Sequence, residues 1–201
     1  MKQNDLIVAI SHAVDDLNVR SIQKLLPKID LDEWPRFPAA MIDDVLLPRS
    51  KLLDNEEKNK NILQIVGLLL EKKPQINHQI LLGAARNGNS SIFSLLLTAS
   101  KKQYGETELA ELFVRKTKNT SSNSYIQEIS PIEAAAEQRH VEILRKMLSL
   151  CKRAKINFFE RSPDLLHSVI SGERTYNRGE APKEADSDET AKKNRMPGAS
   201  S

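Results

Sequence analysis

The chain has 201 residues, a formal net charge of +3 and one cysteine, Cys151. One domain fits this length, the charge is too small to indicate nucleic acid or a membrane surface by itself, and a single cysteine excludes an intrachain disulfide. No window approaches the ~20 apolar residues of a membrane-spanning helix, and the apolar run at residues 6–10 is too short for a signal peptide. We therefore expect a cytoplasmic protein that is not inserted in a membrane and binds no nucleic acid.

Residues 5–27 come first in chain order, and their apolar spacing predicts two short helices that Pro27 ends. The proline-broken loop that follows holds Trp34 and Phe37. We expect these aromatic side chains to pack over the end of the first helical pair, and an exposed binding anchor is the alternative.

Residues 39–47 and 61–72 predict a second, irregular pair of helices. The first of these segments carries four apolar residues on one helical face: Met41, Ile42, Val45 and Leu46. The charged run at residues 53–60 is either a longer connection or an added helical turn.

A four-position apolar pattern recurs along the chain, with the spacing i, i+1, i+4 and i+5 that places four side chains on one helical face. It starts at Ile65, Ile92 and Ile143. An alanine pair precedes two of these starts by eight residues, at 84–85 and 135–136. Because a single helical pair cannot bury such a face alone, the recurrence predicts a stack of repeats.

Residues 101–129 interrupt the recurrence as a large insertion. Its middle, residues 106–116, predicts a helix, because acidic residues begin it and basic residues end it. One apolar stripe runs along this helix: Leu109, Leu112 and Phe113. Residues 117–124 are polar and predict a loop. The insertion is either an extra helix packed on the stack or an elaboration that contacts a partner.

The stretch 130–150 predicts the clearest helical pair. Ser130 is a suitable N-cap, Pro131 suits the first helical position, and Glu133 completes a capping box. We expect the apolar face of the second helix to be core, and it consists of Ile143, Leu144, Met147 and Leu148.

A basic run begins in the same helix and contains no acidic residue. Its members are Arg145, Lys146, Lys152, Arg153 and Lys155. They are either cations that the helix dipole favours and that face solvent, or a surface for an acidic partner.

The composition changes after residue 172. Before that point, Ser162-Pro163 repeats Ser130-Pro131, and the apolar residues that follow predict the inner helix of an incomplete last repeat. Residues 173–201 are polar and should be disordered, because they have too little apolar surface to offset the entropy of ordering. We therefore expect one ordered domain at residues 1–172.

These motifs resemble the ankyrin repeat family. Residues 130–136 and 142–144 match the Thr-Pro-Leu-His, Ala-Ala and Glu-Ile-Val parts of its pattern, and residues 84–97 match the second half. Leu17 and Arg139 stand where the family has its turn glycine. The resemblance implies an all-α, ankyrin-like solenoid of about four helical-hairpin repeats with insertions.

The resemblance also implies a non-catalytic, monomeric module that binds another protein through a concave face and the insertion. In the family, residues at the ends of the inner helices face that concave groove. The matching positions are Asp15, Asp16, Arg86, Asn87, Glu137 and Gln138. Divergent chains of this kind resemble proteins that intracellular bacteria deliver into host cells, which implies a host-cell cytoplasm as a further destination, with the polar tail as an export signal.

Side chains that could carry catalysis are scattered in this sequence. None of the four histidines has a second ligand at metal-binding spacing, one cysteine cannot form a zinc site, and no glycine-rich phosphate loop occurs. We therefore expect no metal, no cofactor and no catalytic residue. The alternative is an effector enzyme that modifies a host protein with an active site formed by the insertions.

Overall fold

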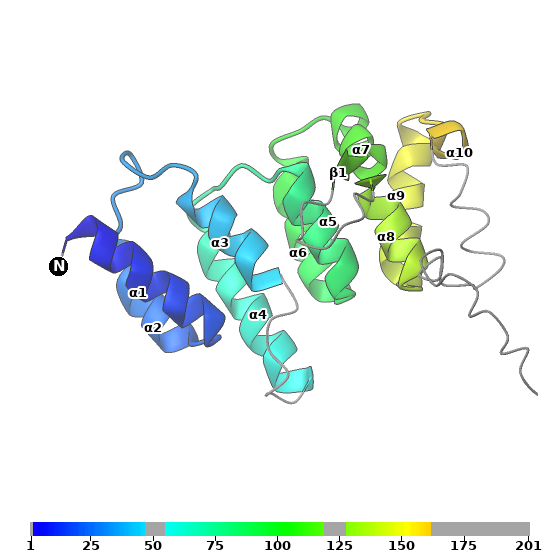
Figure 1. The fold of residues 1–201 in the computed structure, drawn as a ribbon. Helices are drawn as coiled ribbons and strands as arrows, with labels where there is room; N and C mark the ends of the chain where they lie inside the picture. Colours follow the sequence, from blue (N-terminus) through cyan, green and yellow to red (C-terminus); the bar gives the residue numbers. More distant parts are fainter. Residues whose placement is uncertain (1, 47–54, 119–127, 162–201) are drawn as a thin grey trace, which may run out of the picture.

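The computed structural model describes residues 2–46, 55–118 and 128–161, and in these ranges helices joined by short connections make up nearly all of the chain (Figure 1). Strands β1 (Thr117–Lys118) and β2 (Glu128–Ile129) form an antiparallel pair in which Thr117 is opposite Ile129. The all-α class that the sequence predicts is confirmed. The predicted last repeat beyond residue 162 and the predicted disordered tail, 173–201, lie outside the described residues, as do residues 119–124 of the predicted polar loop.

Eight of the helices form two layers. The first layer contains α1 (Gln3–Asp15), α3 (Phe37–Leu46), α5 (His78–Asn87) and α8 (Pro131–Glu137), and each contacts the next in this order. The second layer contains α2 (Val19–Leu25), α4 (Asn55–Leu70), α6 (Ser90–Lys101) and α9 (Val141–Arg153). Each second-layer helix packs on the first-layer helix that precedes it, so the chain advances as a row of helical pairs (Figure 1).

The predicted helices of the second pair occur close to their expected places. The helix predicted at 39–47 is α3, and the charged run at 53–60 is largely helical because α4 already begins at Asn55. A short 3-10 helix, Leu26–Lys28, follows α2 and contains Pro27, which ends the first pair as predicted. A four-residue helix, α10 (Phe158–Arg161), is the last described element.

Side-chain caps fix where several helices begin. Asn77 Oδ1 accepts a hydrogen bond from the amide of Ile80 at 3.1 Å, and Asn89 caps α6 in the same way. The predicted capping box at α8 is confirmed, since Ser130 Oγ accepts from the amide of Glu133 at 3.3 Å and the carboxylate of Glu133 accepts from the amide of Ser130 at 2.8 Å. These bonds satisfy amide groups that the first turn of a helix leaves without partners.

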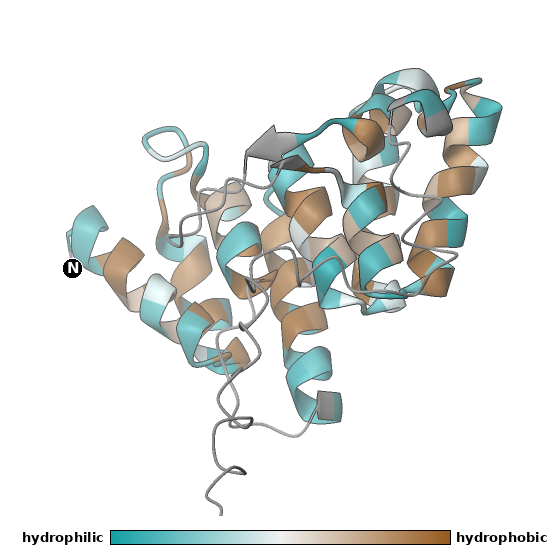
Figure 2. Ribbon diagram, turned by 45° about the vertical axis from the view of Figure 1, so that its right-hand side comes forward, coloured by the Kyte–Doolittle hydropathy of each residue, from teal (hydrophilic) through white to brown (hydrophobic). Residues whose placement is uncertain are grey.

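Apolar residues lie on the helices of both layers and form one continuous core (Figure 2). All four residues of the predicted face of α6 are buried, although Leu97 is 8% exposed, but the predicted face of α9 is only half correct. Ile143 and Met147 are buried, whereas Leu144 and Leu148 are only partly buried. Among the described helices, α9 has a second-layer neighbour on one side only, and Leu150 and Cys151 complete its buried face.

The predicted insertion helix is present as α7 (Glu106–Val114) and packs against helices of both layers. It contacts α5, α6, α8 and α9, and its apolar stripe is buried among them. The rings of Phe113 and Phe93 lie with their centroids 6.1 Å apart. The helix ends two residues earlier than predicted, because Arg115 adopts an extended conformation that leads into β1. Of the two alternatives for the insertion, α7 itself therefore fits the extra helix packed on the stack.

Both ends of α7 are tied to the start of α5 or to the segment just before it. Tyr104 Oη donates a hydrogen bond to the carbonyl of Ile76 at 2.6 Å, and Gln103 Nε2 donates to that of Pro74 at 2.7 Å. At the other end of α7, His78 Nε2 lies 2.8 Å from the carbonyl of Arg115. These bonds hold α7 in register with the neighbouring helical pairs.

Three helical pairs turn through a left-handed residue at the same position. The residues are Leu17, Gly88 and Arg139, with φ of 51°, 81° and 58°. In the last of these turns, the amide of His140 donates to the carbonyl of Ala135 at 2.9 Å, which closes the end of α8. Two of the three turns therefore adopt, with a bulkier residue, a conformation that glycine favours.

Replacing Phe113 with alanine tests whether α7 belongs to the core. The loss of unfolding free energy should be about 3–5 kcal/mol, because a fully buried aromatic ring leaves a cavity between two layers. Urea denaturation followed by circular dichroism measures it. Val141, which is 58% exposed, provides the control, and V141A should stay within about 0.5 kcal/mol of the parent. Equal, small losses in both variants would contradict the packing described for α7.

Arg139→Gly tests the strain in the third turn. The substitution should raise the unfolding free energy by up to about 1 kcal/mol, because glycine adopts positive φ without the cost that a side chain imposes. The reverse change, Gly88→Ala, should lower it, since a Cβ at residue 88 would overlap the imidazole of His140. A loss of stability in R139G would show that the arginine side chain contributes more than its backbone strain costs.

Candidate functional site

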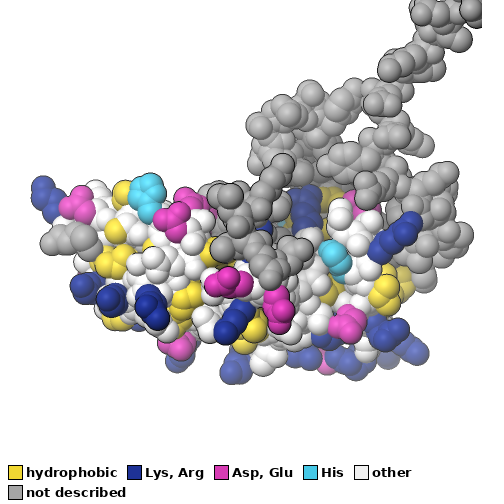
Figure 3. Space-filling model, turned by 90° about the horizontal axis from the view of Figure 1, so that it is seen from below, with side chains coloured by type: hydrophobic (Ala, Val, Ile, Leu, Met, Phe, Trp, Pro, Cys, Tyr) yellow, Lys and Arg dark blue, Asp and Glu magenta, His cyan; other side chains and the backbone are white. Residues whose placement is uncertain are grey.

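The turns after α1, α5 and α8 lie along one edge of the molecule, at the bottom of Figure 1. We call this the turn edge, and it comprises residues 15–18, 86–89 and 137–140. All six residues that the sequence predicts as partner-binding belong to it: Asp15, Asp16, Arg86, Asn87, Glu137 and Gln138. Figure 3 looks at this edge and shows acidic and basic side chains mixed along it.

The structure brings four of these six residues together. The turn after α8 meets the end of α5, where His140 Nε2 lies 3.3 Å from the carbonyl oxygen of Arg86. The imidazole covers Gly88, at the place where any other residue would have its Cβ. Asp15 is the last residue of α1 and Asp16 is its C-cap, and α3 lies between α1 and α5. The predicted set therefore divides into a cluster on α5 and α8 and a separate acidic pair.

The cluster on α5 and α8 combines exposed and partly buried polar groups. Arg86 and Gln138 are exposed, whereas Asn87 and Glu137 are partly buried. Burial raises the pKa of Glu137, the carboxylate of Glu133 raises it further, and the guanidinium of Arg86 opposes both effects. A carboxylate in such an environment works against folding when it is ionised.

Glu133, one helical turn before Glu137, has a structural role. Its side chain completes the capping box of α8 and also forms an ion pair, in which Glu133 Oε1 lies 3.0 Å from Lys116 Nζ. Lys116 lies just after the insertion helix, so this contact ties the insertion to α8. The sequence predicted the capping box but not the ion pair, because nothing in local spacing relates residues 116 and 133.

The sequence also did not predict the contact between His140 and the helical pair formed by α5 and α6. The signal was present in the sequence, since Gly88-Asn89 and Arg139-His140 follow the two alanine pairs at the same offset. Equal spacing from the alanine pairs places the two turns side by side only if their helical pairs are direct neighbours in the stack. That depends on whether the insertion packs between these pairs or beside them. Here α7 packs beside α5 and α8 without separating them.

Other reactive side chains of the described residues serve the core. Cys151 is fully buried, and burial raises the pKa of its thiol to about 11, so it stays protonated at neutral pH. Burial lowers the pKa of the His78 imidazole, since it disfavours the charged form. The Nδ1 atom of His78 has no hydrogen-bond partner within residues 2–46, 55–118 and 128–161. In the same ranges, no group of three or more His, Cys, Asp or Glu side chains is placed to hold a metal ion.

The two aromatic residues of the first loop have different environments. Phe37 starts α3 and is 7% exposed, so it packs on the core as the sequence predicts. Trp34 is 37% exposed and fits the alternative of an accessible side chain. It lies beyond the first helical pair and well apart in sequence from the turn edge.

Comparison of the chain with models of known families, with curated proteins and with solved structures finds no significant match. In the part of the chain that the structure describes, no helix combines the length and apolarity needed to cross a bilayer.

Glu137→Gln tests the cost of the ionised carboxylate. Folding raises the pKa of Glu137, so protonated Glu137 favours the folded state over the unfolded state. This contribution of Glu137 to stability is full below about pH 4, where the side chain is protonated in both states. It is lost as the pH rises through the pKa of the folded state. The variant should therefore melt above the parent at pH 7 and match it near pH 4. The exposed carboxylate of Glu142 gives the control, and E142Q should show no such gain. A lower melting temperature for E137Q at pH 7 would mean that the ionised form is stabilised.

Proposed function

We propose that this chain is a non-catalytic interaction module, an ankyrin-type solenoid of about four helical pairs that binds a partner protein at the turn edge between α5 and α8. Three observations support the type of repeat. The helical pairs advance in two layers, the three left-handed turns occur at equivalent positions, and the family motifs fall on α5, α6, α8 and α9.

The observation that carries the binding site is the cluster of Arg86, Asn87, Glu137 and Gln138. It combines an exposed guanidinium, two side-chain amides and a carboxylate whose pKa burial raises. A partly buried carboxylate that opposes folding is a feature that proteins retain where it serves function rather than stability. A partner that donates hydrogen bonds or a cation to Glu137 and accepts from Arg86 would relieve that cost on binding.

The insertion contributes a second contact surface, which lies at the start of α5 rather than at the turn edge, because Arg115 contacts His78 there. Because α7 contacts both α5 and α8, its connection to β1 and β2 starts next to the pairs that carry the cluster. The partner is another protein, the chain acts as a monomer, and it acts in a cytoplasm. The resemblance to chains delivered by intracellular bacteria supports a host-cell cytoplasm as that place.

A fourfold alanine variant tests the turn edge. A pull-down from candidate host lysate with mass spectrometry first identifies a partner of the parent protein. Replacing Arg86, Asn87, Glu137 and Gln138 with alanine should then weaken the binding of that partner by about 1–3 kcal/mol, because a few central side chains carry most of the binding energy. The variant should remain folded, since turn positions usually cost within about 0.5 kcal/mol each. Titration calorimetry measures the affinity.

Two matched variants locate the partner if it binds elsewhere. D15A/D16A changes the separate acidic pair of the turn edge and should leave the affinity unchanged. Deletion of residues 117–124 should weaken binding only if the insertion takes part. A partner that tolerates the fourfold variant would refute the site on α5 and α8.

A further inference from the structure

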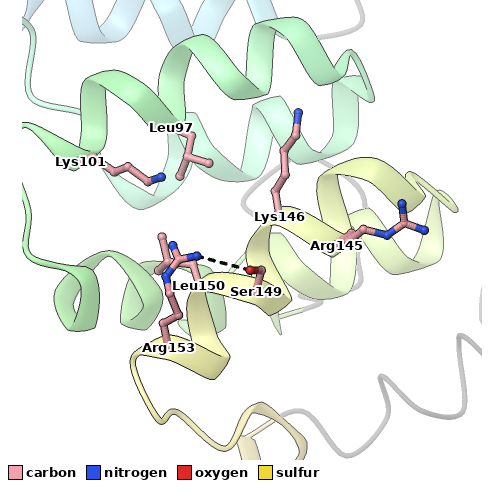
Figure 4. Close-up of a pocket in the computed structure, with 7 residues that line it drawn as sticks. All are labelled: Leu97, Lys101, Arg145, Lys146, Ser149, Leu150 and Arg153. Atoms are coloured by element: carbon pink, nitrogen blue, oxygen red, sulfur yellow. Dashed lines mark hydrogen bonds between the residues drawn. The ribbon is translucent and has the colours of Figure 1, made fainter.

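A hollow of about 290 Å³ lies between the second-layer helices α6 and α9, away from the first layer that carries the turn-edge cluster (Figure 4). Its apolar floor is formed by Leu97 of α6 and Leu150 of α9. Four cationic side chains surround that floor: Lys101, Arg145, Lys146 and Arg153. Among the residues that the structure describes, no acidic side chain lines the hollow.

Little in the described chain neutralises these cations. The side chains of Lys101 and Arg145 have no hydrogen bond or ion pair within residues 2–46, 55–118 and 128–161. Lys146 is partly buried and contacts two neutral oxygens, Oγ of Ser94 and the carbonyl of Ser90. Neither partner carries a negative charge that would offset this half-buried ammonium.

Arg153 has an acidic partner, but one that an anion could replace. Its Nε lies 3.1 Å from Glu106 Oε1, and both side chains are about half exposed. Exposed ion pairs of this kind contribute ~0–1 kcal/mol. The same guanidinium also donates to Ser149 Oγ at 3.4 Å, so Arg153 is held over the hollow while remaining accessible.

Helix dipoles account for only part of this charge. Lys101 ends α6 and Arg153 ends α9, and cations are favoured in the last turn of a helix. Arg145 and Lys146 lie in the first half of α9, where the dipole gives no such preference. Their presence beside an apolar floor therefore needs another explanation.

We infer that this hollow is a binding site for an extended acidic peptide segment of a partner protein, with carboxylates on the four cations and an apolar side chain on Leu97 and Leu150. Figure 4 shows Lys101 and Arg153 near Leu97 and Leu150 at one end, whereas Lys146 points toward α6 and Arg145 points outward at the other end. Arg145 and Arg153 are eight residues apart on one helix, which is about 12 Å along its axis. A chain of several carboxylates matches that length, and one phosphate group does not.

The lining disfavours the other anionic polymers of the cell. The described lining residues include no aromatic side chain on which a nucleic-acid base could stack, and the net charge of the chain is only +3. The chain has an acidic run of its own at residues 180–189, but residues 173–201 as a whole contain six acidic and six basic residues. A separate, uniformly acidic segment therefore complements the hollow better.

Peptide binding tests the site directly. The probe is a fluorescein-labelled peptide of about ten residues, rich in glutamate and with two leucines, long enough to span the hollow at roughly 3.3 Å per residue. Fluorescence anisotropy with the full chain should detect binding that weakens as salt rises. The same peptide with glutamine in place of glutamate should not bind.

Charge reversal locates the peptide on the protein. K101E/R145E should weaken binding about tenfold or more, because it reverses two unpaired cations at opposite ends of the hollow. K152E/K155E changes the net charge equally on exposed residues that do not line the hollow, and it should weaken binding far less. Melting temperature and circular dichroism show that each variant is folded. The fourfold turn-edge variant should bind the peptide as the parent does, which separates this site from the proposed function.

Four results would overturn the inference. Equal losses in the two charge-reversal variants would indicate attraction by net charge alone. Displacement of the peptide by inorganic phosphate, but not by chloride at equal ionic strength, would indicate a small-anion site. Tighter binding of a single-stranded oligonucleotide than of the peptide would indicate nucleic acid. Tenfold tighter peptide binding after deletion of residues 173–201 would show that the chain's own acidic run occupies the hollow.

Discussion

The burial of each helical pair by its neighbour is the constraint on which the rest of this structure depends. The two helices of a pair leave an apolar face that water would otherwise cover, and only the next pair can bury it. Ile92, Phe93 and Leu96 of α6 are fully buried in this way. The insertion obeys the same constraint, because α7 buries its apolar stripe against four helices of the stack rather than extending into solvent. This packing also determines where the turn edge and the hollow between α6 and α9 lie.

Local rules predicted most of the helices, because capping and periodicity act over about four residues. The capping box of Ser130 and Glu133 and the buried face that starts at Ile92 follow from such rules. Leu144 shows their limit, since four positions on one helical face do not reveal how many neighbours the helix has. It is only partly buried, and among the described helices α9 has a single second-layer neighbour, α6. The ankyrin type and the number of repeats remain proposals, and the predicted tail lies outside the described residues.

The candidate site was predictable in its members but not in its grouping. Residue spacing placed Arg86 and Glu137 at equivalent helix ends, yet it could not show that α7 leaves α5 and α8 in contact. The electrostatic interaction between these side chains, and the burial that disfavours the ionised carboxylate, arise only from that contact. The hollow between α6 and α9 shows the same limit. The basic run of α9 was evident in the sequence, whereas Lys101 joins it only through the packing of two helices far apart in the chain.

The short strands β1 and β2 bring together two points of the insertion that are far apart in sequence, with Thr117 opposite Ile129. Paired residues of antiparallel strands lie roughly 5 Å apart, so whatever chain runs between them begins and ends at nearly one point. The entropy of closing such a segment rises by only ~0.6 kcal/mol for each doubling of its length. Sequence between these strands is therefore free to lengthen or change with little effect on the helices. The same position would accept an epitope tag or a foreign recognition loop, displayed from a rigid helical support.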